Sequence, residues 1–270
     1  MNPLPSKHPL LLFRIKALKR RLWAAGAAAA LGLHFQGCAV VQPLIRDINL
    51  VPLAEEKAAG EKMEAEIARQ MKISSDLTQQ ARVRKIGQSL VRVLPKREFE
   101  YRFSVVEDPS PNAFTIPGGA IYVHTGLLSF ASSDDELAGV LGHEIGHAYE
   151  RHPAKAMTRA LGADYLSRML LKGQDSLAAK AALQFARGGI LSKYGRDDER
   201  EADDIGFYLI QTAGYAPDGL LRFMRKLMML SRDTTPVIFR SHPPSEERVK
   251  RLEDLLAGRD RPAGALSRRS

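Results

Sequence analysis

The pentapeptide His143-Glu144-Ile145-Gly146-His147 constrains this chain more than any other feature of its sequence. Its two histidines are four residues apart, so on a helix they lie on the same face and both imidazoles can reach one metal ion. Glu144 follows the first histidine and can reach a water molecule on that ion, where a general base is needed. The alternative is a pair of surface histidines with a salt-bridging glutamate, so the flanking sequence has to decide.

The flanking sequence predicts a helix. Ser133 and Glu136 are spaced as in a capping box, which marks a helix N-terminus. We expect the helix to run to about His152, because Pro153 then interrupts the pattern. His152 lies nine residues after His143, which predicts that it faces away from the motif. Apolar residues recur at helical spacing before and within the motif, at Leu137, Val140, Leu141 and Ile145.

The acidic segment 196–204 offers a third ligand for the metal. A catalytic zinc site has three protein ligands and one position for water. Glu199 and Asp203 are four residues apart and share a helix face, so Glu199 can bind the metal while Asp203 holds a ligand histidine by its other ring nitrogen. Glu201 points the other way and is the alternative ligand, and a solvated acidic helix face is the alternative interpretation. The His/His/Glu set indicates one Zn²⁺ per chain.

Taken together, these residues resemble the HtpX/LoiP/BepA group of gluzincin zinc metallopeptidases, which is related to Oma-type and CAAX-processing proteases. Three further segments match this group in order. Residues 112–119 resemble its NAF-x-x-PGG segment, residues 134–142 its ELAxVLxHE helix, and residues 241–248 its HP-x-S-x-x-R segment. The resemblance covers residues 73–256 and is closest in layout to the small lipoprotein members of the LoiP and YcaL type.

The resemblance implies roles for two further segments. Asn112, Ala113 and Phe114 would lie at a sheet edge beside the zinc, where an extended peptide substrate could pair as an added strand. The alternative is an ordinary hairpin edge. His242 would lie near the zinc, where it could occupy the open position or help to stabilise the oxyanion. The alternative is a histidine that caps its proline-rich loop.

The expected reaction is metal-assisted peptide hydrolysis, in which Glu144 takes a proton from water and passes it to the leaving amine. By resemblance, the substrates would be misfolded or misassembled proteins of the bacterial cell envelope. A chaperone-like assembly lipoprotein with a mostly closed, weakly proteolytic zinc site is the alternative. A zinc hydrolase acting on non-peptide substrates is a third hypothesis, which the NAF segment disfavours.

The first 37 residues predict a lipoprotein-type signal peptide. A basic region without acidic residues precedes an apolar stretch at 22–33 that is too short for a transmembrane span. Phe35-Gln36-Gly37-Cys38 resembles a lipobox, so Cys38 is expected to be lipidated after cleavage, although Phe35 is less usual there than leucine. Ala39 implies, by resemblance to bacterial lipoproteins, the periplasmic face of the outer membrane. An uncleaved inner-membrane anchor or an ordinary cleaved signal are the alternatives.

The positive net charge comes mostly from this leader. Removing its six basic residues from the 40 in the chain leaves 34 against 31 acidic ones, so the net charge falls from +9 to +3. A nucleic-acid partner is therefore not expected. The expected partners are protein substrates and, through Cys38, a membrane.

We expect an α+β fold, namely a mostly helical zincin-type metalloprotease domain with a small sheet beside the HExxH helix. The expected parts are the signal peptide (1–37), a tether with an N-terminal helix (38–72), the zinc metallopeptidase domain (73–256) and a basic flexible tail (257–270).

Within the domain, residues 101–107 and 120–125 predict two strands, joined by a loop at 112–119. Gly214 is expected to end the Glu199 helix, and the next helix to begin at about Asp218. Further helices are expected at 54–72, at 78–94 and as a pair within 155–187.

Overall fold

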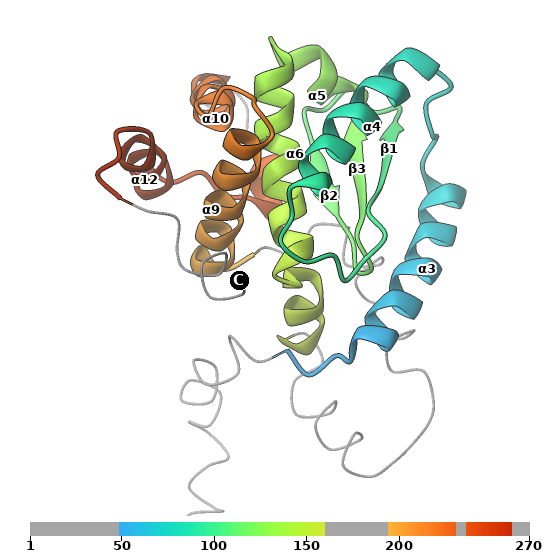
Figure 1. The fold of residues 1–270 in the computed structure, drawn as a ribbon. Coiled ribbons are helices and arrows are strands. Elements are labelled where there is room, and N and C mark those ends of the chain that lie inside the picture. Colours follow the sequence, from blue (N-terminus) through green and yellow to red (C-terminus); the bar gives the residue numbers. More distant parts are fainter. Residues whose placement is uncertain (1–48, 160–193, 231–235, 261–270) are drawn as a thin grey trace, which may run out of the picture. The chain divides into compact units, whose positions relative to one another are not determined.

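The computed structural model describes residues 49–159, 194–230 and 236–260, all within one compact unit that begins at Asn49. The signal peptide, Cys38, most of the basic tail and most of the expected 155–187 helices lie outside the described residues. The elements are α3 (Leu53–Gln70), α4 (Leu77–Arg92), β1 (Arg102–Val106), β2 (Ala113–Thr115), β3 (Ala120–His124), α5 (Thr125–Phe130), α6 (Asp134–Tyr149), α9 (Arg196–Thr212), α10 (Gly219–Leu230), α11 (Ile238–Ser241) and α12 (Glu246–Leu256) (Figure 1). The predicted mostly helical α+β class is confirmed.

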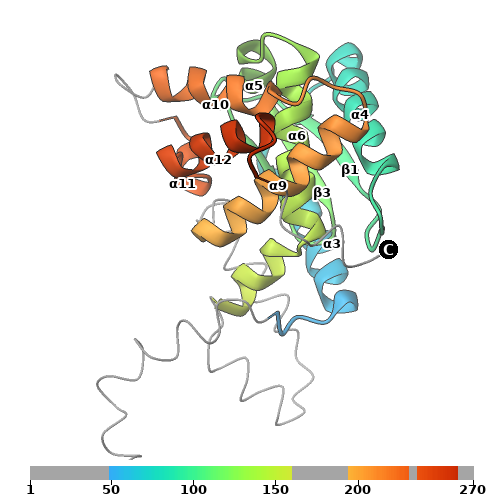
Figure 2. The ribbon, with the colours of Figure 1, turned by 60° about the vertical axis from the view of Figure 1, so that its left-hand side comes forward.

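Helix α6, which carries the HExxH motif, lies at the centre of this arrangement. It packs against α9 and α10 on one side and against α4 and β2 on the other, and both views show α9 lying along it (Figures 1 and 2). Glycines allow the close contact between α6 and α9. A Cβ on Gly146 would lie 2.8 Å from the backbone oxygen of Ala202, and one on Gly206 would lie 2.9 Å from the nitrogen of His143. The two helices that carry the predicted ligands therefore meet backbone to backbone.

The N-terminus of α6 forms as the sequence predicts. The Ser133 hydroxyl accepts a hydrogen bond from the Glu136 N–H at 3.2 Å, which caps the helix. Only half of the expected capping box is present, because Glu136 instead accepts from the Ser132 N–H and from Lys226. The predicted end of the Glu199 helix, α9, is also confirmed, since Gly214 follows this helix with a φ of +85°.

The C-terminus of α6 differs from the prediction. The helix ends at Tyr149 rather than near His152, and a second helical segment occupies residues 152–159. Arg151 between them has a φ of +57°, a conformation that non-glycine residues rarely adopt. Its guanidinium is held at 2.6 Å by both Glu56 and the carbonyl of Val51, so distant contacts stabilise this turn. The turn changes the direction in which His152 points.

The sheet also differs from the expected pair of strands. Its order is β1-β3-β2, with β1 and β3 parallel and β2 and β3 antiparallel. The expected loop at 112–119 therefore contains a third strand, and the tight turn at Gly118 and Gly119, both with positive φ, connects β2 to β3. The chain returns along β2 between β1 and β3, so β1 and β3 run in the same direction and pair in parallel. β2 forms one edge of the sheet.

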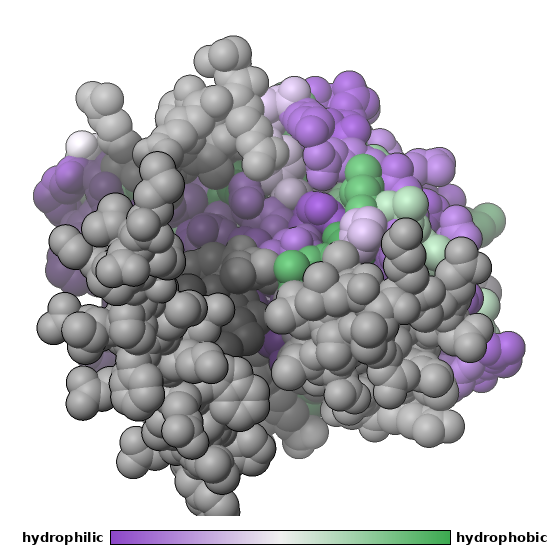
Figure 3. All heavy atoms as spheres, turned by 90° about the horizontal axis from the view of Figure 1, so that it is seen from below, coloured by the Kyte–Doolittle hydropathy of each residue, from purple (hydrophilic) through white to green (hydrophobic). Residues whose placement is uncertain are grey.

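The main core lies between α4, the sheet, α6, α9 and α10. Its fully buried residues include Leu90, Ile121, Leu137, Leu141 and Ile145. On the face shown in Figure 3, the visible described residues are mostly hydrophilic, with small hydrophobic groups between them. None of the helices in the described part of the chain is both long and apolar enough to cross a membrane.

Candidate metal centre

His143 and His147 point from α6 into the interior of the molecule, where both side chains are buried. They are one helical turn apart, so their rings lie close together, with centroids separated by 4.6 Å. The two Nε2 atoms are 3.0 Å apart. Both imidazoles therefore present the same ring nitrogen to one point.

Helix α9 places Glu199 against both histidines. One carboxylate oxygen of Glu199 lies 3.5 Å from His143 Nε2, and the other lies 3.5 Å from His147 Nε2. Asp203 lies one turn further along α9, and its Oδ1 is 2.9 Å from His143 Nδ1. Glu201, the alternative ligand from the sequence, contacts His152 instead of this cluster.

The spacing of these atoms fits a metal ion. Zinc bound tetrahedrally at about 2.0–2.1 Å would hold its ligand atoms about 3.3–3.4 Å apart. The Nε2 atoms of His143 and His147 are 3.0 Å apart, and each lies 3.5 Å from a different carboxylate oxygen of Glu199. All three residues are buried, and their donor set of two imidazoles and one carboxylate is typical of a catalytic zinc site.

His242 joins the same cluster from the loop after α11. Its Nδ1 lies 3.2 Å from His143 Nε2 and 3.0 Å from Glu199 Oε1, so it can supply a fourth ligand atom. Its other nitrogen lies 3.3 Å from Glu144 Oε1. The structure therefore brings His242 to the site, as the resemblance implied, rather than leaving it as a cap of its loop.

Arg248 is a part of the site to which the sequence assigned no role. Its Nε and Nη2 each lie 2.7 Å from one oxygen of Asp203, and its Nη1 lies 2.6 Å from Glu199 Oε2. This buried guanidinium thus connects the carboxylate that faces the histidines with the one that holds His143. The only feature of the sequence that could have pointed to Arg248 was its position in the 241–248 segment, which resembles a segment of the family.

These contacts shift the protonation of the cluster. Burial lowers the pKa of His143, but hydrogen bonds and charges from Asp203 and Glu199 outweigh it and raise that pKa to about 9. Burial and the neighbouring His143 charge hold the pKa of His147 well below its usual range. The pKa of Glu199 is raised by burial but held well below its usual value by His242 and Arg248. Glu199 is therefore a carboxylate, as a metal ligand must be.

Glu144 has a different environment. Its side chain is fully buried, and neither carboxylate oxygen has a hydrogen-bond partner among the described residues. Burial raises the pKa of this carboxyl, more than the nearby His242 and His143 charges lower it. A carboxylate without hydrogen bonds beside the candidate metal ligands is available for proton transfer.

His152 does not face away from the motif, contrary to the prediction. Its Nδ1 lies 2.8 Å from His147 Nδ1, and its Nε2 lies 3.0 Å from Glu201 Oε2. The prediction was wrong because it extended α6 through residue 152, whereas the turn at Arg151 redirects the chain. Nothing in the local sequence indicated this turn.

The predicted substrate edge is the strand β2, and its side chains are buried. Asn112, Ala113 and Phe114 are each at most 3% exposed. The Asn112 carbonyl accepts from the His124 N–H, and the Ile116 N–H donates to the Ala120 carbonyl. Because hydrogen-bonded pairs alternate along an antiparallel ladder, the backbone groups of residues 113 and 115 point away from β3. These backbone groups are nevertheless buried in this structure, because Ala113 and Thr115 are only 0% and 2% exposed.

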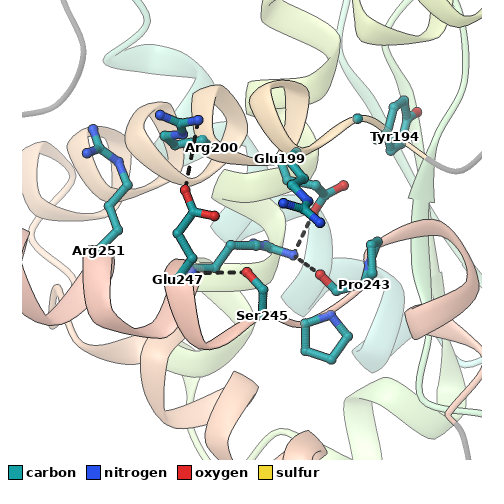
Figure 4. A pocket seen from close by; sticks show the side chains of 11 residues that line it. Tyr194, Glu199, Arg200, Pro243, Ser245, Glu247 and Arg251 are labelled. Carbon is teal, nitrogen blue, oxygen red and sulfur yellow. Dashed lines mark hydrogen bonds and ion pairs between the residues drawn. The ribbon is translucent and has the colours of Figure 1, made fainter.

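Two cavities adjoin the cluster. One, of about 510 Å³, lies between the starts of α9 and α12 and is lined by Tyr194, Glu199 and Ser245 among others (Figure 4). The other, of about 30 Å³, is apolar and lies between α6 and α10, with Glu144 and Met224 in its wall.

The sequence is similar to known metalloproteases. Residues 77–256 match the family model of "Peptidase family M48". Metalloprotease YcaL of Escherichia coli (strain K12) is 32% identical over 180 residues, which are 65% of this chain and 69% of YcaL. The beta-barrel assembly-enhancing protease of Yersinia pestis is 30% identical over 87% of this chain and 51% of that protein. Metalloprotease LoiP of E. coli (strain K12) is 30% identical over 54% and 59%, respectively.

The chain thus spans about half of the beta-barrel assembly-enhancing protease and about two thirds of YcaL. The matched region contains the HExxH helix, the Glu199 helix and the His242 loop. This chain belongs to peptidase family M48 and is a metalloendopeptidase.

Proposed function

We propose that this metalloendopeptidase uses one zinc ion and degrades misfolded or misassembled proteins of the bacterial cell envelope. The observation that carries the catalytic part is the convergence of His143, His147 and Glu199 beside the buried Glu144. In this proposal the first three bind the zinc ion and Asp203 orients His143 through its Nδ1.

Glu144 performs the proton transfers in this proposal. When bound, zinc supplies Lewis acidity, which activates a water molecule and polarises a carbonyl. Glu144 accepts the proton of the attacking water and passes it to the leaving amine. Its raised pKa suits a group that must hold this proton during the reaction. Tyr194 stacks on the His147 ring, with centroids 4.0 Å apart, and fixes the plane of that ligand.

The substrate pairs with β2 in this proposal. The backbone groups of residues 113 and 115 point away from β3, so an extended peptide can pair with them as a further strand once this buried edge is uncovered. In strand addition the substrate is bound through hydrogen bonds to its main chain, so an unfolded segment of any sequence can bind. The apolar cavity beside Glu144 would then receive a small apolar side chain of the substrate.

The proposed location is the periplasmic face of the outer membrane, with a lipid on Cys38. The support is the lipobox-like Phe35-Gln36-Gly37-Cys38 after a basic and apolar leader. The names of two relatives, a beta-barrel assembly-enhancing protease and LoiP, support a bacterial protease with protein substrates. An inner-membrane anchor formed by an uncleaved signal is the alternative, and replacement of Cys38 by serine with continued lipid labelling would exclude the lipoprotein.

One observation favours a second function, that of a chaperone-like assembly factor with weak proteolysis. His242 Nδ1 lies at hydrogen-bonding distance from Glu199, where a water or substrate oxygen would have to bind. A site that closes in this way would act only after His242 moves. A Glu144→Gln variant that still supports envelope assembly in cells would favour this alternative.

Metal analysis tests the proposed ligands. The purified chain should contain one zinc ion, and the Glu199→Ala variant should contain none. Asp197→Asn is the matched control on the same helix and should retain the ion, because Asp197 lies at the surface and pairs with Arg200. Zinc lost from Glu201→Gln and retained by Glu199→Ala would reverse the assignment.

A further inference from the structure

The metal ligand His147 is held by a second histidine on the side that faces away from the site. Its Nε2 lies 3.0 Å from His143 Nε2 and 3.5 Å from Glu199 Oε1. Its Nδ1 lies 2.8 Å from Nδ1 of His152. Both rings are inaccessible to solvent, so no water competes for this contact.

His147, His152 and Glu201 form a row of side chains that leads away from the metal site. The hydrogen bonds along this row determine which ring nitrogen of each histidine carries the proton. An imidazole that binds a metal through Nε2 carries its proton on Nδ1, and in His147 that proton points at His152. His152 Nδ1 must then accept, so a neutral His152 carries its own proton on Nε2. That nitrogen lies 3.0 Å from Glu201 Oε2, which accepts. Every contact in the row therefore has one donor and one acceptor.

The outer end of the row is anchored at the surface. The Glu201 side chain is 43% exposed, and its Oε2 also lies 3.3 Å from Lys155 Nζ. Lys155 belongs to the same helical segment as His152, whereas Glu201 belongs to α9. The row therefore joins the segment after α6 to the helix that carries Glu199.

The backbone supports the same geometry. Arg151, with its positive φ, reverses the chain immediately before His152. Glu56 and the Val51 carbonyl hold its guanidinium. These two distant contacts thus stabilise an unfavourable conformation whose local effect is to bring His152 back toward His147.

The two ligand histidines are held by different groups. His143 Nδ1 lies 2.9 Å from a carboxylate oxygen of Asp203, which is itself paired with Arg248. His147 is stacked on Tyr194, which fixes its plane, and meets the His152 imidazole at its edge. Stacking leaves the tautomer and the rotation of the ring within its plane free, so the contact with His152 determines both.

We propose that His152, anchored by Glu201, is a positioning residue that keeps His147 in the metal-binding tautomer and orientation. This inference rests on the proposed metal site. His152 is not itself a ligand in this proposal, because its two nitrogens are engaged by His147 and Glu201.

The test measures metal affinity directly, with Zn²⁺ in competition with a chelating dye, on the full chain purified in detergent. Loss of a group that orients a ligand histidine typically weakens metal binding about 10- to 100-fold. We expect this loss for His152→Leu, which fills the space without an acceptor. His152→Asn places an acceptor oxygen near the position of Nδ1 and should restore most of the affinity. The visible spectrum of the Co²⁺-loaded chain should change in His152→Leu and return in His152→Asn.

A matched control and a double mutant separate positioning from a general loss of stability. His124 is a similarly buried histidine near a carboxylate, and His124→Leu should leave the Zn²⁺ affinity unchanged. Glu201→Leu lies at the exposed end of the row, so it should fold even if His152→Leu does not, and it should weaken Zn²⁺ binding about tenfold. Adding Glu201→Leu to His152→Leu should cause no further loss, because the two residues act in series.

Three results would overturn the inference. One is an unchanged Zn²⁺ affinity and Co²⁺ spectrum in His152→Leu, and another is additive losses in the double mutant. The third is an unchanged affinity in Glu201→Leu. A wild-type chain that binds no Zn²⁺ would overturn the proposed function as a whole, whereas wild-type and His152→Leu chains that bind Zn²⁺ equally would overturn this inference alone.

Discussion

Replacing Arg248 with methionine would leave two buried carboxylates without their shared cation. Asp203 accepts two hydrogen bonds of 2.7 Å from the Arg248 guanidinium. Glu199 Oε2 forms an ion pair with Arg248 Nη1 at 2.6 Å, and the arginine side chain is only 9% exposed. Methionine has a similar length and fills the same space. The change therefore removes the charge while it preserves much of the packing.

The expected loss follows from the burial of the pair. Breaking a buried ion pair by removing one partner costs about 3–5 kcal/mol, since the remaining charge is not compensated. For a domain of this size, each kcal/mol lowers the melting temperature by about 2–4 °C, so we expect a decrease of about 6–20 °C. Bound zinc would compensate the charge of Glu199, so the loss should be smaller in zinc than in chelator.

The assay is thermal unfolding of the wild-type and variant chains, each in zinc and in chelator. Arg225→Met is the matched control, because Arg225 pairs with Glu253 at 2.6 Å but both side chains are well exposed. That pair should contribute less than about 1 kcal/mol. Equal losses for the two variants, or a loss in Arg248→Met that zinc does not reduce, would refute the reasoning.

Three further predictions concern gating, pH and substrate pairing. His242→Ala should raise turnover of an unfolded substrate about 10- to 100-fold. The reason is that opening the site no longer breaks the hydrogen bond between His242 and the Glu199 carboxylate, which is worth about 1.5–3 kcal/mol. Unchanged turnover would show that His242 does not close the site. Burial raises the pKa of Glu56 from 4.5 to about 7, so the folded state binds this proton more tightly than the unfolded state and loses stability as the pH rises through that range. The fall in the free energy of unfolding between pH 5 and pH 8, measured in urea, should be smaller in Glu56→Gln by up to about 3 kcal/mol, and an equal fall would contradict this. Peptide substrates N-methylated at alternate positions should differ in kcat/KM by about 2- to 10-fold per methylated nitrogen, because only every second N–H faces β2; no dependence on position would exclude strand pairing.

The local parts of the site could be predicted from the sequence. The spacing of His143 and His147 and the spacing of Glu199 and Asp203 both follow from helical periodicity. The cap at Ser133 has the same local origin. These features depend on residues within a few positions of one another, so one sequence contains all the information that they require.

The features that the sequence analysis predicted wrongly or missed depend on contacts between residues that are distant in the sequence. The direction of His152 follows from the turn at Arg151, which Glu56 stabilises from 95 positions away. Arg248 reaches Asp203 across 45 positions. The parallel pairing of β1 with β3 likewise depends on the return of the chain along β2. Helical or strand periodicity in the sequence does not predict contacts between residues so far apart. Only the family resemblance indicated that His242 would reach the site.

Cleavage of casein by residues 39–270, beside the Glu144→Gln variant, tests the central claim most directly. The account predicts that the wild-type chain cleaves casein, that a chelator stops the cleavage and zinc restores it, and that the variant binds zinc but does not cleave. Glu144→Gln keeps the size of the side chain and removes only its ability to take a proton. Equal cleavage by both chains, or inactivity of a zinc-loaded wild-type chain that persists in His242→Ala, would contradict the account.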